Sequence, residues 1–325
     1  GLDPSAIREE PYIPTANSFP LAFAGELGLK VNPNTPVYAF PCVASYVGGD
    51  IVSGVLAARL HKKQELSLFM DIGTNGEMAL GNSEWLIAAA CSAGPCFEGS
   101  GMKHGMRATE GAIEDVRINR KTLEPEIKVI GNTTPIGICG SGMIDVVAEM
   151  FLPGILNQKG KLQREISKRI REGEDGLEFV VYSQDGRDIV LTEPDIENII
   201  RAKAAIYAGF SILLKEVGYT FDDIHKVYIA GGFGKFLDVE KAVILGMLPD
   251  ISREKFEYMG NTSITGAYLC AISRKMREEA EEIARKMTYL ELSVSRSFMD
   301  EYVSALFIPH TNIDAFLSVK ELMKK

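Results

Sequence analysis

No run of eighteen consecutive apolar residues occurs in this 325-residue sequence, so it predicts no membrane-spanning helix. The first residues also lack a basic stretch followed by an apolar one, which argues against secretion. No two cysteines have C-x-x-C spacing, and the odd total of five argues against a disulfide framework and a structural zinc site. We therefore expect small buried thiols in a reducing, cytoplasmic compartment.

Basic clusters are also scarce. The sequence carries 35 Lys and Arg against 44 Asp and Glu, a formal net charge of −9, and shows no basic stripe. Nucleic-acid binding depends on such a stripe, so we expect no nucleic-acid partner. Two common nucleotide signatures are missing as well: G-x-x-x-x-G-K-[ST], and G-x-G-x-x-G between a strand and a helix. These absences argue against a Walker-type site and a dinucleotide-binding fold.

What the sequence does contain is an alternation of short apolar runs with segments of helical periodicity, which predicts an α/β fold. Asn75-Gly76 between two apolar runs predicts a hairpin with a type I′ turn. We expect Ser141 to cap a helix, and one long helix to run from Gly260 to Lys286. The other predicted elements are strands at 37–40, 66–70, 179–182, 188–191, 226–230, 257–259 and 289–293, and helices at 51–60, 193–217, 239–248 and 297–306.

The first candidate phosphate site directly follows an apolar strand, in the sequence D-I-G-T-N-G-E. Gly73 and Gly76 allow the backbone to fold tightly and present N–H groups to an anion. Thr74 adds a hydroxyl and Asn75 an amide at the tip of the turn. Asp71 stands at the end of the strand, where a carboxylate can hold Mg²⁺ through water. An ordinary hairpin explains the same residues, so both interpretations stay open.

Two further glycine-rich segments are candidate ligand sites. Gly231 and Gly232 end a predicted strand and let a flat ring or a ribose lie close to the main chain. Gly140 and Ser141 lead into a predicted helix, whose free N–H groups and dipole favour an anion. A tight turn and a simple capped helix, respectively, explain the same residues without a ligand.

The order of these segments resembles the actin-like ATPase superfamily. In that resemblance the turn after residue 70 is similar to the second phosphate motif, and Ile229–Gly234 to the adenosine motif. Pro41–Asp50 and Gly260–Ala267 look like the two connecting helices, which cross where the lobes meet and act as a hinge. The resemblance implies a two-lobed, ribonuclease H-like α/β fold with mixed sheets.

Within that superfamily the sequence strongly resembles the reductive activators of corrinoid proteins. The resemblance rests on Met70–Glu77, Cys91–Gly99 and Ile138–Asp145, and it extends from Gly1–Ser5 to Leu306–Thr311. It implies that ATP binding and hydrolysis drive the reduction of Co(II) to Co(I) on a partner corrinoid protein. It also implies ATP and Mg²⁺ as cofactors, a 2Fe–2S electron donor in an N-terminal domain, and makes a homodimer plausible.

The sequence differs from this family in what precedes its first residue. A first phosphate motif and the iron–sulfur cysteines are expected upstream of Gly1, so we expect the first lobe to be incomplete and ATP binding to be weakened. Residues 1–66 are interpreted as the remainder of the first lobe with its connecting helix, and residues 67–325 as the second lobe. An inserted segment is expected at about 156–190, and the C-terminal strand and helix are expected to return toward the lobe interface.

Three charged residues have both a functional and a structural interpretation. Lys203 falls on the apolar stripe of its helix, from which it either reaches the nucleotide or extends to solvent. Glu98, in a glycine-rich loop, either orients an attacking water or is simply solvated. Arg107 either contacts phosphate or a partner, or is an ordinary surface group. Together with Asp71, Glu98 is our candidate for the catalytic set.

Two other functions remain open at this point. A small-molecule kinase on the same scaffold requires an acid in the cleft as base for the acceptor, and ADP would form only with that acceptor. A chaperone-like or filament-forming ATPase predicts stimulation by peptides or ATP-dependent polymerisation.

Overall fold

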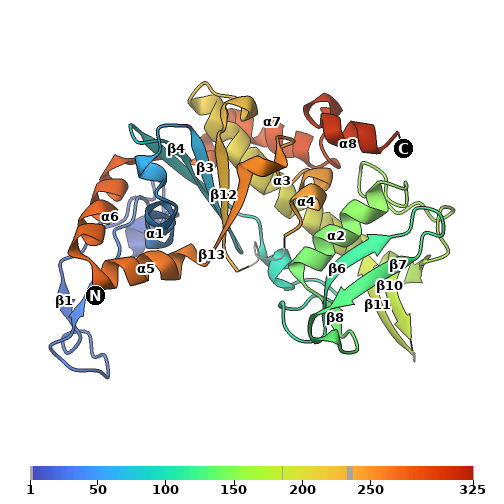
Figure 1. Cartoon of the computed structure of the whole chain (residues 1–325), viewed down its shortest axis with the longest axis horizontal. Coiled ribbons are helices and arrows are strands. Elements are labelled where there is room, and N and C mark those ends of the chain that lie inside the picture. The colour runs from blue at the N-terminus through green and yellow to red at the C-terminus, as the bar shows by residue number, and fades with distance from the viewer. Residues whose placement is uncertain (1–2, 185, 233–236, 325) are drawn as a thin grey trace.

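A computed structural model describes residues 3–184, 186–232 and 237–324. Its larger unit is built on a six-stranded mixed sheet, at the centre of Figure 1. The neighbours β3, β4 and β5 are antiparallel, whereas β12 runs parallel to β3, β13 parallel to β12, and β14 parallel to β5. In spatial order the strands are β13 (Phe256–Gly260), β12 (Lys226–Ala230), β3 (Ser67–Ile72), β4 (Gly76–Gly81), β5 (Leu86–Cys91) and β14 (Met287–Tyr289).

Both faces of this sheet are buried because successive side chains of each strand point to opposite sides. Leu68, Met70 and Ile72 of β3 join the larger hydrophobic core, which the long helix α3 (Glu193–Glu216) covers together with α7 (Arg296–Ala305). Phe69 belongs to the smaller core on the other face, under α1 (Gly49–Ala58). The continuous apolar run of this strand therefore reflects two-sided burial.

On the face of α1, the predicted long helix is two helices. Helix α5 (Thr262–Ile272) ends before Ser273, whose hydroxyl accepts a hydrogen bond from the Met276 N–H and caps α6 (Arg274–Lys286). Residues 262–272 carry no charge and charged residues begin at Arg274, so this change in composition is a signal of the break that the sequence analysis did not use. Helix α5 packs against α1 so closely that a Cβ on Gly266 would lie 2.1 Å from Ser53 Oγ. The first connecting helix was predicted too early, at Pro41–Asp50, because α1 begins only at Gly49, whereas the second prediction, Gly260–Ala267, overlaps the start of α5.

A second, smaller unit follows β5 in the chain and lies to the right in Figure 1. Helix α2 (Gly140–Phe151) packs on β6 (Ala112–Ile118), which pairs with β7 (Pro125–Val129) and β8 (Gly137–Ile138). A three-stranded meander follows, of β9 (Ile170–Gly173), β10 (Gly176–Gln184) and β11 (Arg187–Thr192). The hairpin predicted at 179–191 is confirmed, and β9 is an additional strand in the charged segment.

Helix α3 connects the two units. Thr192 and Asp195 form the capping box that begins it, as the Thr192 position predicts, and Gly218 ends it with φ +74°. Helix α4 (Val239–Leu245), capped by Asp238, follows the β12 turn, and α8 (Leu317–Leu322) lies near the C-terminus. The final strand, predicted at 289–293, is instead Met287–Tyr289, and a 3₁₀ helix occupies Leu292–Val294.

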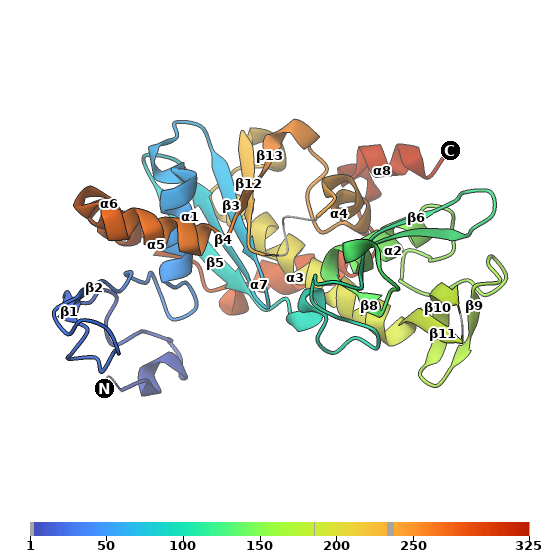
Figure 2. The same ribbon diagram turned by 60° about the horizontal axis from the view of Figure 1, so that its bottom comes forward.

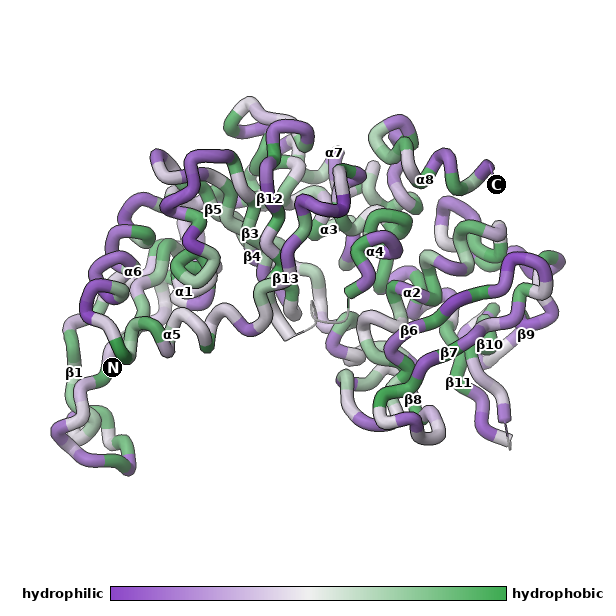
Figure 3. Tube along the Cα trace, viewed as in Figure 1, coloured by the Kyte–Doolittle hydropathy of each residue, from purple (hydrophilic) through white to green (hydrophobic). Residues whose placement is uncertain are grey.

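The N-terminal residues form an extended segment at one end of the molecule, with a short ladder of β1 (Ala22–Phe23) and β2 (Pro36–Val37) (Figure 2). Helix α6 is largely hydrophilic along its length, in keeping with its position on the surface (Figure 3). None of the described helices is long and apolar enough to cross a membrane. The described 3₁₀ helices are η1 (Ser5–Ile7), η2 (Leu60–Lys62), η3 (Pro95–Glu98), η4 (Ile130–Asn132), η5 (Phe221–Asp223), η7 (Arg253–Lys255), η8 (Leu292–Val294) and η9 (Ile313–Ala315).

Candidate functional site

Asp71 lies at the end of the central strand β3, where the antiparallel and parallel parts of the sheet meet. It pairs in register with Glu77 of β4 on one side and with Ala230 of β12 on the other. The predicted hairpin is confirmed, but its turn is not type I′, because neither Asn75 nor Gly76 has a positive φ. A three-residue connection closes the turn instead, and the Gly73 N–H donates to the Asn75 carbonyl over 2.9 Å.

The Gly231-Gly232 turn directly follows β12 and lies against Asp71. Gly231 has φ +94°, and a Cβ there would lie 2.7 Å from Asp71 Oδ1 and 2.8 Å from the Ile72 carbonyl oxygen. Only glycine satisfies both the left-handed backbone and this close approach. A Cβ on Gly232, by contrast, would meet nothing within 4 Å. The turn therefore presents bare, open main chain next to the carboxylate.

Glu98, at the end of η3, reaches across to the β3–β4 turn. The Thr74 hydroxyl donates to Glu98 Oε1 over 3.0 Å. A Cβ on Gly73 would lie 3.8 Å from the same oxygen. The glycine-rich loop that follows β5 thus folds back over the end of β3.

The N-terminus of α2 forms the wall of the smaller unit. The helix begins at Gly140 with Cys139 as its N-cap residue and no side-chain cap. Ser141 is not the cap that the sequence predicted, because its hydroxyl donates to the Glu114 carbonyl oxygen over 3.0 Å and ties the helix to β6. The first N–H groups of α2 are consequently not bonded by a capping side chain.

These segments enclose one cleft with a volume of about 430 Å³. Residues up to 161 positions apart in the chain converge there. Seven of the predicted site residues line it: Asp71, Gly73, Glu98, Gly140, Ser141, Gly231 and Gly232. Five further residues complete the lining: Ile72, Phe97, Arg107, Ala108 and Cys139. Of the predicted adenosine motif, residues 233–234 lie outside the described residues.

Four predicted ligand residues are not part of this lining. Thr74 is exposed on the turn and is joined to the cleft through its hydrogen bond to Glu98. Asn75 lines a different cavity, and Gly76 is buried in the core, where a Cβ would lie 2.8 Å from Cys91 Sγ. Lys203 is fully buried, and its Nζ donates to the carbonyl oxygens of Phe307 and Pro309 over 2.6 Å each. This contact corrects the prediction that Lys203 reaches the nucleotide, because the amine instead secures the C-terminal segment against α3.

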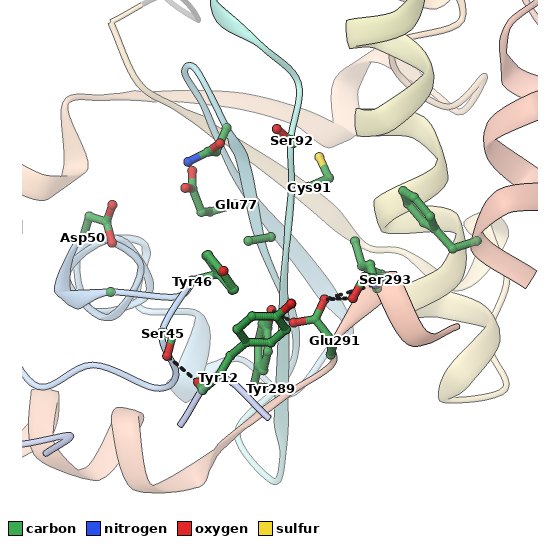
Figure 4. Close-up of a pocket in the computed structure, with 15 residues that line it drawn as sticks. Tyr12, Ser45, Tyr46, Asp50, Glu77, Cys91, Ser92, Tyr289, Glu291 and Ser293 are labelled. Carbon is green, nitrogen blue, oxygen red and sulfur yellow. Dashed lines mark hydrogen bonds between the residues drawn. The ribbon is translucent and has the colours of Figure 1, made fainter. Parts of the chain in front are cut away.

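The second cavity, of about 640 Å³, lies next to the same hairpin (Figure 4). Tyr12, Tyr46 and Tyr289 contribute aromatic rings to it, and Asp50, Glu77 and Glu291 contribute carboxylates. The sequence analysis did not select these three acids. The signal that could have indicated Glu77 is its position directly after the turn, opposite Asp71 in the ladder.

The chain is similar to known proteins over nearly its whole length. Residues 65–320 match the family described as the C-terminal domain of RACo, the ASKHA domain, and residues 1–63 match the RACo middle region. The chain belongs to the RACo family. The resemblance to reductive activators and the predicted actin-like, mixed α/β fold are thereby confirmed.

Three relatives of the RACo-family chain have informative names. A solved structure of a "Reductive activator for corrinoid,iron-sulfur protein" is 55% identical, with a TM-score of 0.91 over 97% of this chain and 51% of that one. The corrinoid activation enzyme RamQ of Eubacterium limosum is 32% identical over 287 residues, 85% of this chain and 48% of RamQ. A [Co(II) methylated amine-specific corrinoid protein] reductase of Methanosarcina barkeri is 29% identical over 301 residues, 86% of this chain and 53% of the reductase. The chain thus spans about half the length of these relatives.

Two carboxyl groups beside the hairpin of this RACo-family chain have raised pKa values. Burial, with a further contribution from Asp50, raises the pKa of Asp71 to about 6. Burial also raises the pKa of Glu77 to about 7, assisted by the charges of Asp50 and Asp71. Acids with perturbed pKa values beside a cleft are typical of functional sites.

These raised pKa values predict a pH-dependent cost to stability. In the unfolded chain Glu77 ionises near its ordinary pKa, so between about pH 4 and 7 the folded protein binds more protons and its free energy of unfolding falls as pH rises. Glu77→Gln removes this cost. We expect the variant's stability advantage over the wild type to grow by about 2 kcal/mol between pH 5 and pH 8 in urea unfolding, after allowance for solvent screening.

The control for this measurement is Glu84→Gln, at an exposed position in the turn after β4. Its stability difference from the wild type should stay constant across the same pH range. A Glu77→Gln advantage that is equally flat would show that Glu77 titrates as an ordinary surface acid.

The RACo-family site fits a nucleotide-bound magnesium ion better than a metal held by protein alone. Within residues 3–184, 186–232 and 237–324, no group of three or more His, Cys, Asp or Glu side chains could hold a metal ion. Mg²⁺ commonly keeps several waters and takes one or two carboxylates together with substrate phosphates, which Asp71 can satisfy. The five cysteines are all free, and four are buried. They do not fit an iron–sulfur cluster, which needs several cysteines grouped together.

Proposed function

We propose that this chain is the ATP-binding and ATP-hydrolysing part of a reductive activator that drives the reduction of Co(II) to Co(I) in a corrinoid protein. The observation that carries the proposal is the single cleft formed by the strand-end carboxylate Asp71, the bare Gly231-Gly232 turn and the uncapped N-terminus of α2. The names of the relatives support the corrinoid protein as substrate.

Each wall of the cleft has a role in this proposal. Gly231 and Gly232 receive the adenosine, since a side chain at either position would separate the ligand from the main chain. Gly73, Thr74 and the first residues of α2, Gly140 and Ser141, face the phosphates. Asp71 holds Mg²⁺, which supplies charge neutralisation at the phosphates when it is bound.

Glu98 positions the water that attacks the terminal phosphate. Its Oε1 is fixed by the Thr74 hydroxyl at 3.0 Å, directly over the turn that faces the phosphates. A carboxylate in this position accepts a hydrogen bond from water and orients its lone pair. With Asp71 assigned to Mg²⁺ and Glu98 to the water, the described lining of the cleft carries no third acid for a small-molecule acceptor.

The remaining parts of the proposal concern the protein beyond this cleft. We propose that residues 1–66 complete a first lobe and that residues 67–325 form the second, in a cytoplasmic protein. The free thiols support a reducing compartment. The electron donor is a 2Fe–2S domain outside these residues, and the full-length protein is a homodimer, which light scattering can test.

The function is tested with the full-length protein and a corrinoid protein from the same organism, held in the Co(II) state under anaerobic conditions. With an electron donor present, we expect Co(I) absorbance to appear only when Mg·ATP is added. We also expect the corrinoid protein to accelerate ATP hydrolysis. If no corrinoid protein of that organism does either, the proposed function is wrong, and ADP formation that depends on a small-molecule acceptor would indicate a kinase.

Calorimetric titration of Mg·ATP separates binding from activity. We would titrate both this chain and the full-length protein. Binding only by the full-length protein would show that the clamp needs both lobes, whereas no binding by either would show that the glycine turns are structural.

A further inference from the structure

The loop between η3 and β6 crosses itself at two glycines. A Cβ on Gly105 would lie 2.2 Å from the Gly99 carbonyl oxygen, and a Cβ on Gly99 would lie 2.4 Å from the Met106 nitrogen. The crossing therefore requires both glycines. Glu98 directly precedes Gly99, and Arg107 follows Gly105 by two residues; both line the nucleotide cleft.

The Arg107 side of this crossing is fixed to the strand that leads into α2. The Met106 N–H donates to the Ile138 carbonyl over 3.0 Å, and the Ile138 N–H donates to the His104 carbonyl over 2.8 Å. Gly105 forms a parallel bridge with Ile138, the residue directly before Cys139. The backbone of Arg107 is consequently held beside the N-terminus of α2.

Arg107 is the one cationic side chain among the described residues that line the cleft, against the carboxylates of Asp71 and Glu98. It is exposed, and within the described part of the chain no acidic side chain forms an ion pair with it. Arginines elsewhere in the same unit are used differently: Arg169 and Arg171 are paired with Glu124 and Glu178. The guanidinium of Arg107 is thus available to a ligand.

We propose that Arg107 is the residue that recognises the phosphates of the bound nucleotide. This inference rests on the proposed function and assigns the source of positive charge in a cleft whose other charged groups are acids. The planar guanidinium donates two parallel hydrogen bonds to phosphate oxygens. Glu98 keeps its hydrogen bond from the Thr74 hydroxyl. The two side chains therefore have different roles: Arg107 binds the phosphate, and Glu98 faces the attacking water.

The test measures affinity in the full-length protein by calorimetry, with Mg·ATP, Mg·ADP and adenosine as ligands. Charge-assisted hydrogen bonds of this type predict that Arg107→Ala weakens Mg·ATP binding about 10- to 100-fold. Adenosine, which carries no phosphate, should bind the variant as well as the wild type. Arg107→Lys should recover part of the loss, because it restores the charge without the fork.

The matched control is Arg120→Ala, an exposed arginine in the turn between β6 and β7 of the same unit. It should leave all three affinities unchanged, and thermal melts should show that both alanine variants fold. Equal Mg·ATP affinity of wild type and Arg107→Ala overturns the inference and leaves the proposed function standing. An equal loss for ATP and adenosine overturns it too, because the contact would then be to the adenosine end. Failure of the wild type itself to bind Mg·ATP overturns both.

Discussion

Replacing Lys241 with methionine is expected to lower the free energy of unfolding by about 3–5 kcal/mol, which is the cost of leaving a buried charge without its partner. Lys241 of α4 is 6% exposed, and its Nζ lies 2.9 Å from Asp145 Oδ2 of α2 and 2.9 Å from Asp115 Oδ1 of β6. It also donates to the Val116 carbonyl over 2.7 Å. Urea unfolding of this chain measures the loss.

Asp145 is the buried partner that the Lys241 substitution would leave without its ion pair. It is 3% exposed, and its Oδ2 accepts hydrogen bonds from the Lys241 amine and from the Val116 N–H. The double variant Lys241→Met with Asp145→Leu should recover much of the stability, since a buried pair replaced by apolar residues is often neutral. Lys159→Met, at an exposed position, should stay within about 0.5 kcal/mol of the wild type. A single variant as stable as this control would mean that the pair contributes nothing.

Asp71→Asn is expected to lower the rate of Mg·ATP hydrolysis by the full-length protein about 100-fold or more. Losing about 3 kcal/mol of metal-assisted stabilisation corresponds to that factor. The same substitution should leave the melting temperature at pH 8 unchanged or raise it, because burial raises the pKa of Asp71 and makes its ionised form costly there. Loss of activity without loss of stability is the outcome that identifies a functional carboxylate.

Asp175→Asn supplies the comparison, since this aspartate is an exposed residue in the turn between β9 and β10. It should alter neither hydrolysis nor melting. Should Asp71→Asn hydrolyse Mg·ATP at the wild-type rate, Asp71 has no role in holding the metal, and the assignment of the cleft to the phosphates loses its main support.

Local chemistry explains which parts of the fold could be predicted from the sequence. The strand ending at Asp71 and the helix beginning after Thr192 follow from apolar runs and cap residues, and both are confirmed. The type I′ turn was wrong because the Asn-Gly pair also satisfies another requirement, the close packing of Gly76 against Cys91. The break at Ser273 was missed because one helix was continued from the uncharged segment 262–272 into the charged segment 274–286, although serine is a common N-cap residue.

Tertiary contacts explain which parts of the site could not be predicted. Periodicity correctly placed Lys203 on the buried stripe of α3, but nothing in the sequence shows that residues 307–309 pass beside it to accept its hydrogen bonds. Likewise, Arg107 looked like one basic residue on a loop. Only the crossing of Gly99 and Gly105 brings it to the cleft that Glu98 also lines, and no sequence pattern marks that crossing.

The contact between α1 and α5 restricts how the two ends of this chain can move relative to each other. Ser53 donates to the carbonyl oxygens of Thr262 and Ser263, and Gly266 leaves no room between the helices. Because no space separates α1 from α5 at Gly266, the side chains there cannot repack to let the two helices separate gradually. We therefore expect these helices to slide along each other, as in shear motion, rather than to open like a hinge. Helix α1 precedes β3, the strand that carries Asp71 near its end. Sliding of α1 along α5 would therefore displace Asp71 along the axis of that strand, within the nucleotide cleft.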